Sequence, residues 1–159
     1  MRWDLVDSFK FLKKGQSSVA FKSFSGSEDF FEEHFPGKPL VPDVLFIEMI
    51  AQAGGVLYGY GIDFQREVIL AKIFEATFLK AVSPPCCFEI EAHLEEEREE
   101  GGLISGTVKM GAELVARAKL LLLTIESFET DRKTQIVFSE SFLKHYDIYN
   151  IAKLSGDVI

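Results

Sequence analysis

The sequence is poor in cysteine and in positive charge, and both shortages exclude classes of protein. Its 159 residues include two cysteines, the neighbours Cys86 and Cys87. Adjacent cysteines rarely reach disulfide geometry, and two thiols alone do not complete a structural zinc site. Lys and Arg number 17 against 25 Asp and Glu, so the formal net charge is −8. This balance disfavours nucleic acid as a partner, because binding it requires a basic surface.

Long apolar runs are also missing. No stretch reaches about 18 apolar residues without a charge, so the sequence predicts no transmembrane helix and no membrane insertion. The residues from Met1 to Asp4 are partly charged, and no apolar run with a small-residue cleavage site follows them, as a signal peptide would require. We therefore expect a cytoplasmic protein.

Apolar residues as a whole are plentiful. They make up 47% of the chain against 26% charged residues, which is typical of a soluble globular domain. A chain of this length can bury roughly two-thirds of its unfolded surface, so it needs no disulfide or metal ion to stabilise its fold. Fifteen phenylalanines predict a large aromatic interior or an apolar binding pocket.

Alternation and turn residues predict a sheet interrupted by one helix, an α+β arrangement with the helix packed on one face of an antiparallel sheet. A proline-containing loop covers residues 25–42. The helix should begin after Pro42, with the Asp43 side chain as its N-cap, and continue to Tyr58. The expected strands cover residues 3–12, 17–24, 67–80, 87–97, 103–110 and 113–127, with a charged hairpin tip at 95–102 that turns at the two glycines 101 and 102.

The predicted helix is apolar on nearly every side, which is typical of a buried helix. Its polar interior residues are Glu48 and Gln52, one turn apart on the same face. An unpaired carboxylate in such surroundings costs several kcal/mol, so its presence points to a use. Two plainer interpretations stay open. Glu48 could be a charge at a helix edge or subunit interface, and His34, in the preceding loop, could simply be hydrogen-bonded locally.

Taken together, these residues favour acid–base chemistry. A histidine and a carboxyl group beside an apolar helix can act as general base and general acid. The free backbone N–H groups at the helix start can hold a developing oxyanion. Such a set is what proton abstraction next to a thioester carbonyl requires. Proton movement needs no cofactor, and His93 and His145 lie in no metal-ligand spacing, so neither a cofactor nor a metal site is expected.

Residues 34–52, HFPGKPLVPDVLFIEMIAQ, resemble the signature of the bacterial 3-hydroxyacyl-[acyl-carrier-protein] dehydratases, the FabA/FabZ group. The likeness covers roughly residues 4–127. It implies a hotdog fold, in which a curved antiparallel sheet wraps a long central helix. It also implies dehydration of a (3R)-hydroxyacyl thioester to the trans-2-enoyl thioester, in fatty-acid or related lipid synthesis.

The resemblance also implies roles for individual residues. His34 takes the proton from C2, and Glu48 protonates the departing 3-hydroxyl. The backbone N–H of Asp43 or of Val44 binds the thioester carbonyl. The other implied residues are Gln52 and Gly37, which support the site, and Phe74 and Phe78, which line the acyl tunnel.

The implied partners are an acyl thioester, carried on acyl carrier protein or coenzyme A, and a second copy of the chain. In the family, each site combines the histidine of one subunit with the glutamate of the other, which implies a homodimer or a trimer of dimers. Because acyl carrier proteins are acidic, docking requires a local basic rim, for which Lys80 and Lys38 are candidates and Arg117 a weaker one.

The sequence departs from the family pattern at the helix start. Asp43 stands where the family usually has glycine, which places a negative side chain near the oxyanion position. The pair Pro85–Cys86 replaces a usual Gly-Asp turn. Two other functions therefore stay open: a hotdog acyl-thioesterase, and a catalytically weakened acyl-binding subunit, which Asp43 favours.

A second departure is an extension over residues 128–159, beyond a dehydratase-like domain over residues 1–127. We expect a short strand at 134–138 and an amphipathic helix at 139–154, capped by Ser139 or Ser141. Its apolar face needs a surface to cover. We expect it to pack on the outside of the domain, over a sheet edge or a dimer contact.

Overall fold

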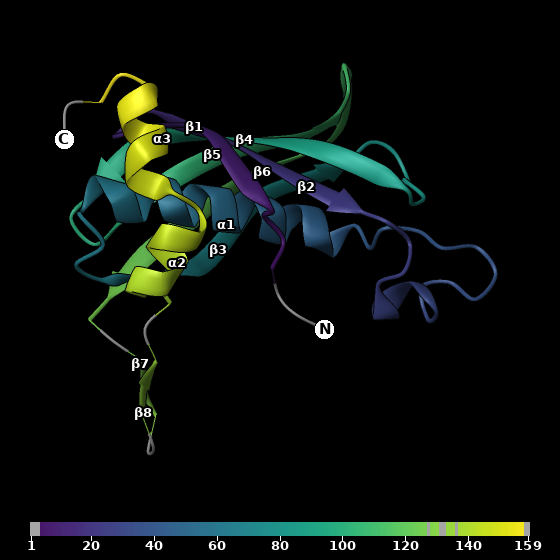
Figure 1. Cartoon of the computed structure of the whole chain (residues 1–159), viewed down its shortest axis with the longest axis horizontal. Helices are drawn as coiled ribbons and strands as arrows, with labels where there is room; N and C mark the ends of the chain where they lie inside the picture. Colours follow the sequence, from purple (N-terminus) through teal and green to yellow (C-terminus); the bar gives the residue numbers. More distant parts are fainter. Residues whose placement is uncertain (1–3, 127, 131–132, 136, 158–159) are drawn as a thin grey trace.

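A six-stranded antiparallel sheet and one long helix form the body of the molecule (Figure 1). The computed structural model describes residues 4–126, 128–130, 133–135 and 137–157. The strand order in the sheet is β1-β2-β4-β5-β6-β3, and the long helix α1 lies against one face. This is the hotdog arrangement that the resemblance implies. The elements of this body are β1 (Ser8–Lys13), β2 (Ser17–Phe24), the 3-10 turn η1 (Asp29–Phe31), α1 (Val44–Gly61), β3 (Glu67–Phe78), β4 (Cys86–Arg98), β5 (Gly101–Met110) and β6 (Glu113–Ile125).

Alternating side chains of the sheet pack against α1 and form the core. In β4, Phe88, Ile90 and Ala92 are fully buried, while the residues between them are not. This period of two is the geometry of a strand with one face covered. Gly106 of β5 lets the helix come close, because a Cβ there would lie 2.3 Å from the Ile50 side chain.

The apolar composition of α1 follows from this burial. By length and hydropathy the helix could cross a membrane, but 72% of its 18-residue window is buried inside the protein. Phe46, Met49, Ile50 and Leu57 have almost no exposed surface. The helix is thus the core element of a layered α+β fold.

The expected strands are present, with shifted ends. Strand β1 begins at Ser8, whereas we expected it from residue 3 onward; Trp3 itself lies outside the described residues. The hairpin between β4 and β5 turns at Glu99 and Glu100 and not at the two glycines, which is a correction. Gly101 and Gly102 are paired with β6, and a Cβ at Gly101 would lie 2.1 Å from the Leu122 carbonyl oxygen. These glycines therefore serve close strand packing.

The extension forms a small sheet and two short helices, α2 (Glu140–His145) and α3 (Ile148–Leu154). The small sheet pairs β7 (Phe128–Thr130) with β8 (Lys133–Gln135) and projects from the body (Figure 1). The expected strand at 134–138 overlaps β8, and residue 136 lies outside the described part. The single helix expected at 139–154 is wrong: Asp147 adopts a φ of 50° and separates α2 from α3.

Helix α3 packs along β1, at one edge of the sheet. Ile148 and Ala152 are buried there. The Leu12 backbone N–H donates to Ser155 Oγ at 3.1 Å, and the Lys14 N–H donates to Asp157 Oδ2 at 2.7 Å. The extension therefore satisfies backbone donors that an edge strand would leave to water.

Candidate active site

His34 lies in the loop before α1, and hydrogen bonds to Leu40 fix its position. The Leu40 N–H donates to the His34 carbonyl at 3.0 Å, and His34 Nδ1 lies 3.2 Å from the Leu40 carbonyl oxygen. A carbonyl can only accept, so Nδ1 carries the proton of the neutral ring. Nε2 then has a free lone pair, and among the described residues it has no hydrogen-bond partner. The ring therefore has the tautomer of a general base.

A tight turn closes this loop. The Phe35 and Lys38 backbones bond each other in both directions, at 3.2 and 2.9 Å, around Pro36 and Gly37. Gly37 has a φ of +73°, which suits the third position of a type II turn and is unfavourable for other residues. The Phe35 ring stacks on the His34 ring, with centroids 4.3 Å apart. Gly37 thus supports His34 through the backbone.

The start of α1 presents free backbone donors. Asp43 and Val44 are exposed, and their N–H groups find no acceptor within the described ranges. The helix instead begins with bonds from Leu45 to Pro42 and from Phe46 to Asp43. The expected capping by the Asp43 side chain is wrong: its backbone is already helical and the carboxylate makes no cap hydrogen bond. A capping side chain usually requires an extended backbone at that residue.

Glu48 and Gln52 are joined in a short polar chain on the half-buried face of α1. Gln52 Oε1 accepts the Leu5 backbone N–H at 3.0 Å, which orients the amide so that its NH2 group donates to Glu48 Oε1 at 2.9 Å. Glu48 Oε2 has no partner in the described part of the chain. A proton held by this carboxyl group would therefore lie on Oε2.

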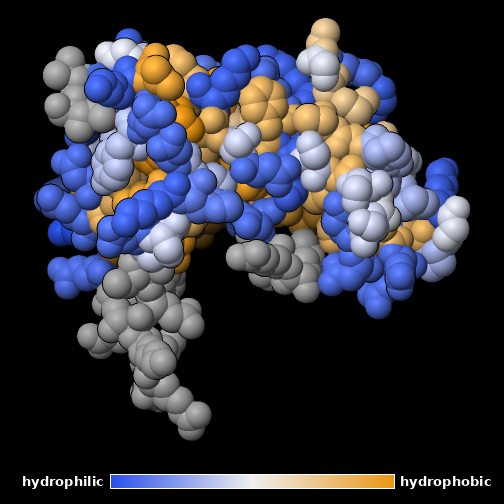
Figure 2. Space-filling view, viewed as in Figure 1, coloured by the Kyte–Doolittle hydropathy of each residue, from blue (hydrophilic) through white to orange (hydrophobic). Residues whose placement is uncertain are grey.

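This polar pair borders an apolar cavity of about 280 Å³. On the face shown in Figure 2, apolar side chains lie recessed behind a rim of polar ones. The helix α1, the N-terminal segment, β3 and the C-terminal extension all contribute walls. The lining residues in α1 are Glu48, Ala51, Gln52, Gly55 and Val56; those elsewhere are Asp4, Val6, Phe9, Val68, Ile69, Leu70, Leu122, Val137, Phe138, Phe142 and Tyr146.

One chain does not bring all the expected site residues to this cavity. Glu48 and Gln52 line it, whereas His34, the helix start at Asp43 and Val44, and Gly37 are not among its lining residues. The expected tunnel residues also lie elsewhere. Phe74 and Phe78 are on β3, at the sheet edge opposite β1, with 48% and 38% of their surface exposed.

The sequence did not point to the residues of the extension that face Glu48. Phe142 and Tyr146 were expected in a helix on the outside of the domain, and Phe138 in a short strand, but all three line the same cavity as the carboxylate. The only available signal was their spacing of four residues, which places them on one side of a helical segment. The spacing could not indicate which surface that side covers.

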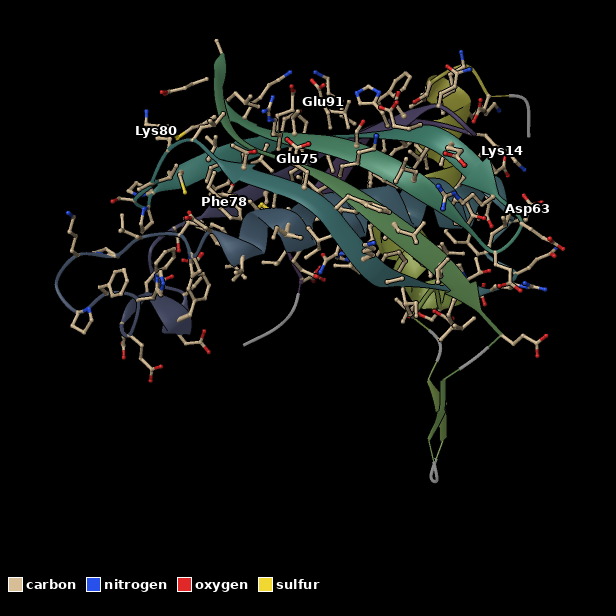
Figure 3. All side chains as sticks on the ribbon, turned by 180° about the vertical axis from the view of Figure 1, so that it is seen from behind. Lys14, Asp63, Glu75, Phe78, Lys80 and Glu91 are labelled. Carbon is tan, nitrogen blue, oxygen red and sulfur yellow. The ribbon has the colours of Figure 1, made fainter. Side chains whose placement is uncertain are left out.

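The candidate basic rim is partly neutralised. Lys80, just beyond the end of β3 and near Phe78 in Figure 3, pairs with Glu113 at 2.5 Å. Arg117 lies 3.7 Å from Glu75. Lys38, in the His34 loop, is exposed and has no ion-pair partner in the ranges the structure describes.

Cys86 is not suited to act as a nucleophile. Burial raises the pKa of the Cys86 thiol to about 11, so this thiol stays protonated at neutral pH and reacts poorly. Within the described residues, no group of three or more His, Cys, Asp or Glu side chains could hold a metal ion.

Sequence comparison finds 3-hydroxyacyl-[acyl-carrier-protein] dehydratases among the relatives of this chain. A family model described as the FabA-like domain matches residues 4–119. The 3-hydroxyacyl-[acyl-carrier-protein] dehydratase FabZ of Pelotomaculum thermopropionicum is 36% identical over 118 residues, covering 74% of this chain and 84% of the relative. The FabZ dehydratase of Clostridium tetani is 32% identical over 120 residues, covering 75% of this chain and 84% of the relative.

Solved structures share the fold at lower identity. An uncharacterized protein from Pyrococcus horikoshii superimposes with a TM-score of 0.60 at 20% identity, covering 77% of this chain and 85% of that one. A hypothetical thioesterase from Streptococcus pneumoniae TIGR4, solved with coenzyme A, gives a TM-score of 0.58 at 10% identity, covering 74% of this chain and 86% of that one. At these identities the likeness shows a common fold and does not select between activities.

Proposed function

Because the chain belongs to the FabA-like family of 3-hydroxyacyl-[acyl-carrier-protein] dehydratases, we propose a working site in which His34 and Glu48 remove water from a (3R)-hydroxyacyl thioester. The protein is a dehydratase, a lyase that gives the trans-2-enoyl thioester in fatty-acid synthesis. The site assignment rests on His34 Nε2 and Glu48 Oε2, neither of which has a hydrogen-bond partner among the described residues. The other polar atom of each group is held: Nδ1 by Leu40 and Oε1 by Gln52.

His34 acts as the base. Its Nε2 takes the proton from C2, and the electron pair of that C–H bond forms the double bond between C2 and C3. The Leu40 carbonyl, 3.2 Å from Nδ1, stabilises the imidazolium that results. A backbone N–H at the helix start, from Asp43 or Val44, donates a hydrogen bond to the thioester oxygen and stabilises the negative charge that develops there.

Glu48 acts as the acid. The carboxyl proton on Oε2 passes to the 3-hydroxyl, the C3–O bond breaks, and water leaves. Gln52 holds Oε1, so the acid presents one oxygen to the substrate. The proton taken by His34 returns to Glu48, directly or through water, before the next cycle. No redox change occurs, so proton transfer alone balances the reaction.

A second copy of the chain completes this site in our proposal. His34 does not line the cavity that contains Glu48, so the two groups reach one substrate most simply across a subunit boundary. The edge strand β3 exposes Ile73 and Phe74 at 46% and 48%. An open apolar sheet edge of this kind favours pairing with another chain. The carrier-linked thioester would then enter near the His34 loop.

A weakened acyl-binding subunit is the second candidate, and Asp43 is the observation that favours it. Its exposed carboxylate lies at the helix start, where negative charge opposes an enolate-like transition state. A turnover measurement separates this candidate from an active dehydratase, because a weakened subunit would bind the thioester without converting it.

The deciding experiment is a dehydration assay with 3-hydroxyacyl thioesters on acyl carrier protein and on coenzyme A. Formation of the enoyl product by the wild-type protein is the expected result. Binding of the substrates without turnover would instead support the weakened subunit. Release of free thiol from an acyl thioester that lacks a 3-hydroxyl would support a thioesterase.

A further inference from the structure

One wall of the Glu48 cavity comes from a part of the chain that the family match does not include. The FabA-like match ends at residue 119, whereas Val137, Phe138, Phe142 and Tyr146 line the cavity. We propose that this segment closes the acyl cavity, and that Phe138 and Phe142 set the length of the acyl chain that the enzyme accepts. The inference rests on the proposed function, because the occupant it names is the substrate's acyl chain.

The wall is anchored at both ends by bonds to distant parts of the chain. At one end, the Val137 N–H donates to Oε2 of Glu67, a carboxylate that is only 6% exposed, at 3.0 Å. At the other end, the Tyr146 hydroxyl donates to the Val6 carbonyl at 2.9 Å and also contacts the Asp4 carboxylate. The Tyr146–Val6 bond is buried and therefore costly to break, and the Val137–Glu67 bond is partly buried. Together they attach both ends of the segment to the body.

Aromatic contacts make the wall continuous. The Phe138 and Phe142 rings lie 5.6 Å apart, and the Phe142 and Tyr146 rings 4.8 Å apart. Tyr146 in turn meets Phe9 of β1 edge-on at 5.7 Å, and Phe138 meets Phe64 at 5.0 Å. Ring pairs at these separations add to the stability of the packing. The row therefore forms a continuous boundary from Phe64, in the turn after α1, to Phe9 of β1 at the sheet edge.

The chemistry of the cavity selects an apolar occupant. Glu48 and Gln52 occupy one side, Asp4 is engaged with Tyr146, and the remaining lining is aliphatic or aromatic. If Oε2 of Glu48 meets the 3-hydroxyl, the carbons beyond C3 extend from that point into the cavity. At about 280 Å³ the space lies just below the common range of ligand pockets, roughly 300–1,000 Å³, so it limits chain length.

Gly55 provides a way to shorten the cavity without disturbing the fold. It is buried and lines the cavity, and a Cβ built on it has no other atom within 4 Å. A side chain at this position therefore extends into the empty space. The neighbouring Gly54 is the contrast, because its Cβ would lie 2.9 Å from Ile104 in the core.

The test compares wild type, Phe142→Leu and Gly55→Val on 3-hydroxyacyl thioesters of increasing chain length. Phe142→Leu should raise kcat/KM for chains longer than the wild-type optimum, and Gly55→Val should lower it for the longest chains that wild type accepts. A change of about tenfold is expected in each case, because one methylene in an apolar pocket changes kcat/KM by roughly 10- to 200-fold. Leu143→Ala is the matched control, since Leu143 is half-buried on the same helix but does not line the cavity.

Parallel binding measurements with saturated acyl thioesters, which cannot be dehydrated, separate this inference from the proposed function. If wild type dehydrates its substrates and both variants keep the wild-type length profile in turnover and binding, the extension does not set chain length. If wild type shows no turnover, the proposed function fails, while a shift in binding length between the variants would still support the wall. Should Phe142→Leu fold poorly, Phe138→Leu takes its place, because Phe138 lines the same wall.

Discussion

At the scale of single residues, the proposed chemistry uses the His34 imidazole as base and the Glu48 carboxyl group as acid. His34→Ala and Glu48→Gln should each lower kcat by about 10²–10⁴-fold, the contribution of a positioned acid or base. Because the two act on one proton path, the double variant should be little slower than the slower single variant. Steady-state kinetics with circular dichroism as a folding control measures this. Either single variant retaining near-wild-type turnover would remove its residue from the mechanism.

Asp43 gives a second prediction at the residue scale. Since the structure shows no capping by its side chain, replacing it should cost less stability than the loss of a cap would. The carboxylate makes no cap hydrogen bond and no other one to the residues that the structure describes, so its removal should cost little there. Asp43→Gly should therefore raise turnover by relieving charge near the oxyanion. The free energy of unfolding should fall by no more than about 0.5–1 kcal/mol, the backbone cost of glycine.

Asp43→Asn is the matched control for this substitution, because it removes the charge and keeps a side chain. It should reproduce most of the gain in kcat. A clear fall in kcat for both variants would mean that the carboxylate assists the reaction.

At the scale of elements, the extension behaves as part of the domain, since it covers both β1 and the cavity. Tyr146→Phe should lower the free energy of unfolding by about 1–3 kcal/mol, because the buried Val6 carbonyl loses its donor. Tyr149→Phe removes the same atom from an exposed ring that makes no hydrogen bond among the described residues, and it should change stability little. Chemical denaturation of the two variants measures the difference. Equal effects would mean that the Tyr146 contact contributes no stability.

The sequence predicted the elements whose signals are local. Alternation in β4 and the unbroken apolar run of α1 identify a half-covered strand and a buried helix wherever they occur. The break at Asp147 has only a weak local signal: aspartate has low helix propensity and tolerates a positive φ, but it also occurs inside helices, so one aspartate does not predict a break. The cavity wall is less predictable still: Tyr146 meets Val6 across 140 positions of sequence, and no local spacing encodes that partner.

Within the site, too, the sequence indicated only what depends on local residue patterns. The spacing between His34 and Glu48 made both residues candidates, and their catalytic roles stay predictions. The turn that holds His34 was expected only as part of a proline-containing loop over residues 25–42. The absence of a cap at Asp43 could not be anticipated, since it depends on a helical backbone at that residue. The roles of Phe74 and Phe78 remain predictions, because both side chains are exposed on the open edge of one chain.

At the scale of the whole molecule, the proposed shared site is testable by mixing inactive variants. Equal amounts of His34→Ala and Glu48→Gln chains, allowed to exchange, should regain activity. Random pairing in a two-fold dimer leaves about a quarter of the sites with both residues intact. Native mass spectrometry verifies exchange. Proven exchange without any recovered turnover would show that each site forms within one chain.

Reversing the charge of the lysines in the candidate basic rim tests whether this rim binds the acidic carrier protein. Lys38→Glu and Lys80→Glu should weaken use of a carrier-linked substrate by up to about fivefold, matching the roughly 1 kcal/mol of an exposed charge pair. Lys38 should have the larger effect, because Glu113 already neutralises Lys80. Added salt should reduce the difference.

Lys14→Glu is the control for the carrier prediction. Lys14 pairs with Asp63 at 3.3 Å and lies at the far end of the molecule from Lys80 (Figure 3). A small thioester mimic should be used equally by all three variants. Equal losses on the mimic and on the carrier-linked substrate would count against docking at this rim.

Because α3 packs along β1, it also limits which edge of the sheet can pair with a strand from another copy of the chain. Ser155 and Asp157 take backbone donors of the β1 side, so this edge is closed to another strand. The β3 edge has no such cover from the described residues. A chain with one closed and one open edge can join a like chain only once, open edge to open edge. If two copies pair through their β3 edges, as in the proposed dimer, edge pairing would end at two copies and the covered β1 strand would prevent open-ended assembly into fibres.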